Sequence, residues 1–339
     1  MAIVSSGQVS LADLQTEFGG TNPIEMSEYY RNGGLVPSGA SSVPESGEIE
    51  LADFYGTSAY TPTSATGGTT SDVTISGRQY RVHTFTSSGT FTVNSVGTET
   101  YAEYLIVAGG GSGGNTKHGG GGGAGGYRSG VTGESSGGGA SAESTQTLSA
   151  TSYSVTVGTG GSNMSRGTNS SVFSKTSTGG GRGASDGGGV AQSGGSGGGG
   201  GQFESNGAAG TANQGFAGGN PGSTSGCYPA AGGGGAGAVG GNGIGSGGPA
   251  GDGGVGVSSN ITGSATFRAG GGGGATTPGG CTVGSGGNGG GGAGSQANGV
   301  DGTDGTGGGG GGGERNGTSP QGGDGGNGIV IIRYPLEAA

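Results

Sequence analysis

Glycine dominates residues 109–328 of this chain, and no other feature constrains the fold as strongly. The chain holds 102 glycines in 339 residues, and the tract contains glycine runs at 119–123, 197–201, 289–292 and 307–313. Glycine loses more backbone entropy on ordering than any other residue and offers no side chain to pack, so an ordinary hydrophobic core cannot be built from it. An apolar strand pattern stands at each end, at 104–108 and 329–334. We therefore expect the tract to be an insertion between two paired strands.

Such a tract is either a flexible linker or an array of extended segments whose backbones hydrogen-bond to one another. Large side chains and prolines interrupt the glycine runs, for example Pro229, Pro249 and Pro278, which favours folded segments joined by turns. We predict a bundle of polyglycine-II helices, the polyproline-II-like form with about three residues per turn. Collagen is excluded because there are only 10 prolines and no strict three-residue period. A disordered tether between ordered ends stays open as an alternative.

The bulk composition limits the remaining structure and the partners. Hydrophobic residues make up 27% of the chain and charged residues 9%, with no Trp, so a conventional core must be small. The net charge of −10 and the scattered basic residues argue against nucleic acid as a partner. No apolar run is long enough to cross a membrane, and the N-terminus lacks the pattern of a signal peptide, so we expect no membrane insertion. Cys227 and Cys281 are the only cysteines; we favour unpaired thiols, with a disulfide between loops as the alternative.

Residues 1–57 contain two copies of one motif, at 6–14 and 46–54. In the first copy Ser10 can cap a helix with Asp13 in its first turn, and glycines at 19 and 20 end it. A second short helix is predicted from Asn22 as cap and Pro23 in the first turn. We expect this block to be too small to bury its apolar side chains comfortably alone, and therefore to attach to a partner or to a copy of itself. The alternative is a small independent helical cap. The candidate attachment residues are Leu11, Leu14, Phe18, Tyr29, Tyr30, Leu51, Phe54 and Tyr55.

The hydrophobic period changes to two from residue 72. Residues 58–71, rich in Thr, Ser, Gly and Pro, are interpreted as a linker. Strand patterns follow at 73–75, 80–86, 90–93, 101–108, 144–148, 153–157, 171–173 and 329–334. The short stretch 87–89 suggests a hairpin turn between the second and third of these strands. We expect a mainly β protein in which residues 72–178 and 329–336 form a small jelly-roll-like β-sandwich that anchors the glycine-rich bundle, 179–328.

The order of these motifs resembles the glycine-rich domain of tail-fibre and tail proteins of tailed bacteriophages, with marine and cyanobacterial phage versions most similar. The resemblance rests on the strands at 80–85, 89–93 and 153–158, the sequence 103–111, the glycine-rich stretch 119–127 and the end 326–335. The N-terminal stretches 7–14, 27–34 and 51–56 also resemble the start of such virion proteins. The resemblance implies a virion protein, commonly trimeric, made in the host cytoplasm. In related tip adhesins, the loops joining polyglycine-II helices contact the host receptor; this chain differs by carrying its own N-terminal block.

If the glycine runs are rods, recognition must lie in the stretches that join them: 202–206, 211–214, 223–231, 257–268, 275–278, 281–283, 295–298 and 314–321. Aromatic and arginine side chains carry most contact energy at interfaces. The receptor-contact candidates are Phe203, Phe216, Tyr228, Phe267, Arg268 and Arg315. An alternative for Phe203, Phe216 and Phe267 is that they plug the ends or the sides of the bundle.

No pattern in the chain indicates an enzyme, a cofactor or a metal site. The many glycine-spaced matches to nucleotide-binding motifs carry no information in such a tract, and neither lysine follows the glycine that a phosphate-binding loop requires. Residues 301–305 resemble a calcium loop only faintly and are interpreted as a solvated turn. We expect a tail-associated fibre or adhesin that anchors by its N-terminus to other virion tail proteins and binds a host-surface protein or glycan. The alternatives are a free surface or ice-binding protein of the glycine-rich kind, and a purely structural fibre with a disordered tether.

Overall fold

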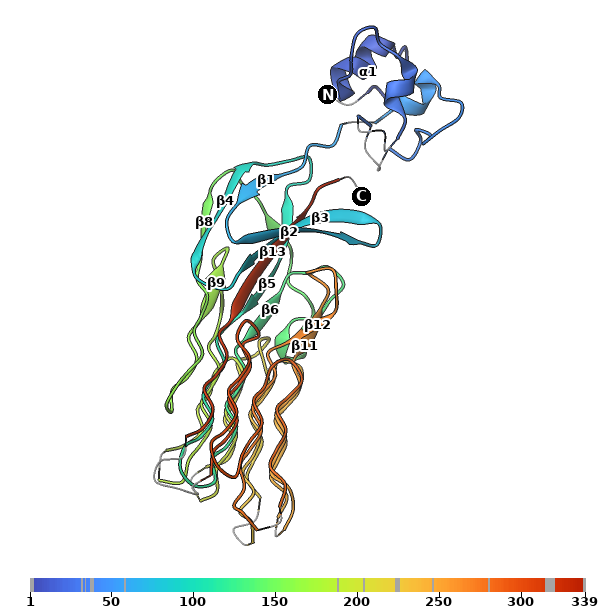
Figure 1. The fold of residues 1–339 in the computed structure, drawn as a ribbon. Coiled ribbons are helices and arrows are strands. Elements are labelled where there is room, and N and C mark those ends of the chain that lie inside the picture. Colours follow the sequence, from blue (N-terminus) through green and yellow to red (C-terminus); the bar gives the residue numbers. More distant parts are fainter. Residues whose placement is uncertain are drawn as a thin grey trace.

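The computed structural model describes residues 3–337 except residues 32, 34, 37–39, 58, 188, 204, 223–225, 246, 280 and 315–320. The molecule is elongated (Figure 1). A small block with the N-terminus lies at one end, β-sheets lie in the middle, and long glycine-rich segments run side by side away from the sheets.

The N-terminal block begins with the helix that the sequence predicts. Helix α1 spans Leu11–Phe18, and Ser10 caps it: the Ser10 Oγ accepts from the Asp13 backbone N–H while the Asp13 carboxylate accepts from the Ser10 backbone N–H. Gly19 ends the helix with φ of 78°, a left-handed conformation that suits glycine. The second predicted helix is shorter than expected, a 3₁₀-helix η1 at Met26–Tyr29. Asn22 does not cap it, because the Asn22 side-chain oxygen instead accepts a hydrogen bond from Gln15 Nε2 at 3.2 Å.

The second motif copy forms the 3₁₀-helix η2 at Leu51–Phe54, where Glu50 and Asp53 repeat the reciprocal capping of the first copy. The two copies are also tied in the same way. Gly7 O accepts from the hydroxyl of Tyr55, and Gly47 O, at the matching position of the second copy, accepts from the hydroxyl of Tyr30. These two tyrosines therefore hold the block together internally.

The β-region contains thirteen strands among the described residues. Their bounds are β1 Ser64–Thr66, β2 Thr69–Ile75, β3 Arg78–Phe85, β4 Gly89–Ser95, β5 Tyr101–Val107, β6 Tyr127–Ser129, β7 Gln146–Thr147, β8 Ser152–Val155, β9 Ser170–Val172, β10 Lys175–Ser177, β11 Val257–Ser259, β12 Thr266–Arg268 and β13 Ile329–Pro335. One antiparallel sheet has the order β2-β3-β13-β5-β6, with β7 pairing with β5. A second has the order β1-β4-β8, and the hairpins β9–β10 and β11–β12 stand apart. A short 3₁₀-turn, η3, lies at Gly137–Gly139. The expectation of a mainly β protein is confirmed.

Two local predictions in this region are wrong. The chain between β3 and β4 is not a hairpin, because β3 pairs with β2 and β13 whereas β4 pairs with β1 and β8 in the other sheet. The stretch 58–71 is not simply a linker, because β1 and the start of β2 lie within it. The pairing of β3 with the distant β13 decides the first point, and the pairing of β1 with β4 and of β2 with β3 decides the second.

The two sheets share a hydrophobic core. Phe91, Val93 and Val155 from β4 and β8 belong to one buried cluster with Tyr104 and Ile332 from β5 and β13. The other face of the larger sheet contributes Val82, Leu105 and Ile331 to a second cluster, which includes Ile261 from the loop between β11 and β12.

The strands that flank the glycine tract pair as predicted. β5 and β13 are antiparallel neighbours, with Ile329 opposite Val107 and Ile332 opposite Tyr104. The 220 or so intervening residues leave and re-enter the sheet between two adjacent strands. The glycine tract is therefore an insertion in this sheet.

Backbone hydrogen bonds hold the glycine segments to one another. Gly122 N donates to Gly310 O at 2.7 Å, Gly272 N to Gly122 O at 2.9 Å, and Gly233 N to Gly272 O at 2.8 Å, so four distant segments meet around one position. A Cβ atom on Gly122 would lie 2.1 Å from Gly111 O, and one on Gly233 would lie 2.0 Å from Gly122 O. The backbones are too close for any side chain there, which explains why the tract requires glycine.

Candidate functional site

The turns between glycine segments lie at two ends of the array, and the chain path identifies the far end. The segment 109–114 leaves β5, turns at 115–118 and returns as 119–126 to β6; the segment 307–314 likewise precedes the return 321–328 to β13. His118 and Glu314 therefore lie at the end away from the sheets, where Figure 1 shows a set of turns. We call this the far end, and the end against the sheets the near end.

Three aromatic rings meet at the far end. His118 lies 4.8 Å from Tyr228 and 5.9 Å from Phe203 between ring centroids, and Phe203 lies 5.7 Å from Tyr228. His118 is buried, Tyr228 is half-buried, and Phe203 is 59% exposed. We call these three residues the far-end cluster. It presents an aromatic surface to solvent on a buried support.

Glu314 anchors the base of the cluster. Its Oε2 accepts a hydrogen bond from the His118 backbone N–H at 2.6 Å and lies 3.1 Å from His118 Nδ1. Both side chains are almost fully buried. Glu314 therefore joins the turn that carries His118 to the end of the glycine run 307–313 through a buried backbone hydrogen bond.

Gln202 and a disulfide support the Tyr228 side of the cluster. Gln202 Nε2 donates to Pro229 O at 2.9 Å, and Cys227 is bonded to Cys281. The expectation of unpaired thiols is wrong, because the array brings these residues, 54 positions apart, to a Cα–Cα distance of 6.1 Å.

The backbone of the cluster is unusual. His118, Phe203 and Tyr228 have φ values of 56°, 68° and 50°, in the left-handed region that non-glycine residues rarely adopt. Such conformations persist only where the surroundings impose them, and they concentrate at functional sites. Three aromatic residues held this way at one end of the molecule mark it as a candidate binding site.

The structure separates the six predicted receptor-contact residues. Phe203 and Tyr228 come together in the far-end cluster. Phe216 is half-buried near the η3 turn, with its Cζ 3.5 Å from the position that a Cβ on Gly139 would occupy. Arg315 lies outside the described residues.

The stretch 257–268 is not a far-end turn. It forms the hairpin β11–β12 at the near end, where Ile261 packs into the sheet core and Arg333 Nη1 donates to Asn260 O at 3.0 Å. Phe267 is 42% exposed there. Arg268 is only 7% exposed, and burial lowers the pKa of its guanidinium, so its prediction as a contact residue is wrong.

Sequence reasoning placed Gln202 and Glu314 within the joining stretches 202–206 and 314–321 but named neither as a contact residue, and it assigned no role to His118. Nothing in their sequence spacing links them, because Glu314 lies 196 residues from His118. Their common position, next to the interruptions of glycine runs, was the available signal.

The predicted attachment residues of the N-terminal block form its own core instead. Leu14, Phe18, Tyr29 and Phe54 are buried together in one cluster, which Leu11 and Leu51 flank. The expectation that this block cannot bury its apolar side chains by itself is wrong for these four. The N-terminal segment and both motif copies contribute to the core, which the sequence pattern of either copy alone does not reveal.

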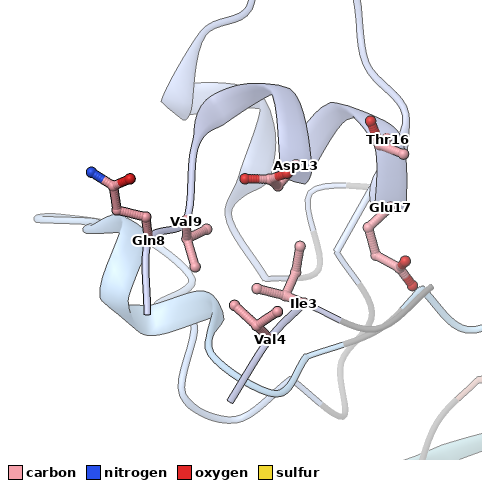
Figure 2. A pocket seen from close by; sticks show the side chains of 7 residues that line it. All are labelled: Ile3, Val4, Gln8, Val9, Asp13, Thr16 and Glu17. Atoms are coloured by element: carbon pink, nitrogen blue, oxygen red, sulfur yellow. The ribbon is translucent and has the colours of Figure 1, made fainter. Parts of the chain in front are cut away.

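A cavity of about 130 Å³ opens on this block (Figure 2). Ile3, Val4 and Val9 converge on it beneath α1, and Asp13, Thr16 and Glu17 line it from the helix. Glu17 Oε1 accepts from the Ala59 backbone N–H at 2.9 Å, which ties the helix to the chain leading into the sheets. Val4 is 53% exposed and Tyr55 38%, so apolar surface remains open beside this cavity.

The carboxylates of Asp301 and Asp304 accept hydrogen bonds from backbone N–H groups. Asp301 Oδ1 accepts from the Asp324 N–H at 2.7 Å, and Asp304 Oδ1 accepts from the Asn327 N–H at 2.8 Å. Within the part of the chain that the structure describes, no three His, Cys, Asp or Glu residues are grouped to hold a metal ion. No helix among the described residues is long and apolar enough to span a membrane.

Comparison with known protein families identifies a match over most of the chain. Residues 86–335 match the family described as "Glycine-rich domain", which covers most of the chain from the end of β3 to the end of β13. No curated protein is significantly similar to the chain in sequence.

Proposed function

The chain belongs to the glycine-rich domain family, and from this premise we propose that it is a structural adhesin of a bacteriophage tail. The N-terminal block attaches it to other tail proteins, and the far-end cluster binds the host surface, a protein or a glycan. The exposed aromatic surface at the end opposite the N-terminal block is the observation that carries the proposal. The resemblance of the sequence to tail-fibre proteins supplies the phage context. The mechanism is binding without catalysis.

The architecture suits a rigid spacer. We infer that the glycine segments form a polyglycine-II bundle, since their backbones donate to several neighbouring segments rather than to one partner strand, as around Gly122. We also infer that the two sheets form a β-sandwich around their shared core. In such a body the far-end turns are free to vary, because the hydrogen bonds that hold the bundle lie behind them.

Attachment is proposed through the apolar surface that the N-terminal block leaves open. The proposed contact surface consists of Val4 and the cavity beside Val9. The earlier candidates Leu14, Phe18, Tyr29 and Phe54 are buried and cannot form it. We propose that three copies associate there, as in the resembling proteins. Many copies on one particle then convert weak single contacts into firm attachment.

The test uses two phenylalanines of similar exposure at opposite ends. Fluorescently labelled full-length protein is titrated onto a panel of bacterial strains, and Phe203→Ala is compared with Phe267→Ala. A contact residue of this size contributes about 2 kcal/mol, so Phe203→Ala should weaken cell binding about thirtyfold, and Phe267→Ala should not change it. Equal binding by both variants, or no binding to any strain, contradicts the proposed function.

A second test addresses attachment. Val4 and Val300 are both 53% exposed, and Val300 lies in the glycine tract. Val4→Asp should dissociate the assembly, measured as mass by light scattering, and Val300→Asp should leave it intact. A monomeric wild-type protein contradicts the proposed trimer.

A further inference from the structure

The Cys227–Cys281 disulfide lies directly beside the far-end cluster. Cys227 directly precedes Tyr228, and beyond Pro229 the chain joins the hydrogen-bonded array through Ala230 N, which donates to Ala275 O at 3.0 Å. The bond to Cys281 is thus the covalent support of the segment that carries Tyr228.

Three hydrogen bonds converge on the same point. Cys227 O accepts from Thr276 Oγ1 at 2.7 Å, from Thr277 N at 3.0 Å and from Thr277 Oγ1 at 3.0 Å. On the partner cysteine, Cys281 O accepts from Gln296 Nε2 at 3.0 Å. The disulfide therefore joins two turns, and the two threonines set the position of the carbonyl that precedes Tyr228.

Tyr228 needs this support because its conformation is costly. With φ of 50°, a residue carrying a Cβ reverts to an extended or helical conformation unless its neighbours prevent it. Its ring then leaves His118 and Phe203. The glycine segments that follow Ala230 keep their own backbone hydrogen bonds. The conformational change of Tyr228 is therefore confined to the far end.

We propose that the far-end cluster is assembled by oxidation: the Cys227–Cys281 disulfide positions Tyr228, and reduction of this bond releases it. In a reducing cytoplasm both residues are thiols, and the bond forms once the protein meets an oxidising medium. The oxidant is a low-molecular-weight disulfide. The two thiols lose two protons and two electrons as the S–S bond forms, and the oxidant accepts them and leaves as two thiols. The two cysteines are largely buried, each 8% exposed.

The biological purpose of this redox control rests on the proposed function, because the cluster that it controls is the proposed binding site. The test of the redox control itself needs no receptor. Full-length protein is labelled with 3-fluorotyrosine, and the Tyr228 resonance is assigned by loss of one signal in Tyr228→Phe. In the oxidised protein this resonance should be displaced by the neighbouring rings, and after reduction with a phosphine it should move to the position of a free tyrosine. The other tyrosine resonances, including that of Tyr104 in the sheet core, should stay in place.

Two variants separate the effect of the disulfide from that of the hydrogen bonds to Cys227 O. The double substitution Cys227→Ser with Cys281→Ser should show the reduced spectrum without reductant. Thr276→Val keeps the disulfide but removes one of the hydrogen bonds to Cys227 O, and should shift the resonance less than reduction does. If the double variant does not fold, reduction and reoxidation of the native protein still give the comparison.

Two outcomes overturn the inference: a Tyr228 resonance that does not move on reduction, and movement of all tyrosine resonances together, which assigns the disulfide to the whole fold. Cell binding measured on both redox forms separates this inference from the proposed function. A redox-dependent resonance without binding by either form contradicts the function alone, whereas binding with an unchanged resonance contradicts the redox inference alone.

Discussion

The glycine at position 122 offers the most direct test of how the array is held. Gly122 contacts three other segments: its N–H donates to Gly310 O, its carbonyl accepts from Gly272 N, and the adjacent Gly123 O accepts from Gly111 N. In Gly122→Ala the new Cβ lies 2.1 Å from Gly111 O, whereas ordinary contacts begin at 3.4 Å. The obstructing atom is backbone, so no side chain can rotate away.

The magnitude follows from the displacement. Restoring an ordinary contact moves the segments apart by about 1.3 Å, which stretches hydrogen bonds of 2.7 to 2.9 Å beyond their useful range. Overpacking of this kind costs about 1–3 kcal/mol, and each of two or three lost hydrogen bonds costs about 1 kcal/mol. We expect Gly122→Ala to lower the free energy of unfolding by about 4 kcal/mol.

The assay is urea unfolding followed by tyrosine fluorescence, since the chain has no Trp. The control is Gly89→Ala in β4, where the nearest atom to the new Cβ is 3.6 Å away on Phe85 and φ is not in the left-handed region. There the methyl group fits, and the substitution should be neutral or stabilise by less than about 1 kcal/mol. Equal unfolding midpoints for the two variants would refute the close-packed backbone as the source of stability.

Three further outcomes are expected. Glu103→Gln should lower the free energy of unfolding, measured in urea, by about 3–5 kcal/mol, because it leaves the buried Arg333 guanidinium without the carboxylate that lies 2.6 Å away. The control Asp72→Asn breaks an exposed pair with Arg81 and should cost less than about 1 kcal/mol. Similar losses of unfolding free energy in the two variants would contradict this prediction. Burial lowers the pKa of His83 below 6.5, so the unfolded chain binds the proton more readily, and the free energy of unfolding should fall as the pH drops below 6.5. His83→Gln should weaken the dependence of the unfolding midpoint on pH between pH 7 and 5. An unchanged dependence in this variant would count against the prediction. Burial raises the pKa of Glu143, but hydrogen bonds from Arg128 and Tyr104 outweigh this effect and hold the pKa below 4.5. The free energy of unfolding should therefore fall as the pH drops below 4.5. Glu143→Gln should lose less stability over the same pH range in acid titrations followed by circular dichroism.

Local sequence patterns determined several elements correctly. Ser10 and Asp13 cap α1 because capping needs only residues three positions apart. The nearly continuous apolar runs placed β5 and β13, because both faces of these strands are buried. The glycine runs also indicated where backbones approach one another closely, since the absence of Cβ atoms is itself a local property. Phe203 and Tyr228 of the far-end cluster were among the contact candidates because they interrupt glycine runs, and their contact with a receptor stays a prediction.

Tertiary structure alone decided the rest. The pairing of β3 with β13 rather than β4 depends on contacts across about 250 residues, which leave no trace in local periodicity. Arg268 is buried at the near end because its hairpin folds against the sheet, and Cys227 meets Cys281 because two segments of the array run side by side. His118 and Glu314 form the base of the cluster for the same reason. Glycine runs allow backbones to approach closely, but their sequences are too alike to specify which segments become neighbours. The side chains in the turns and the strands at the ends of the tract determine which segments lie side by side.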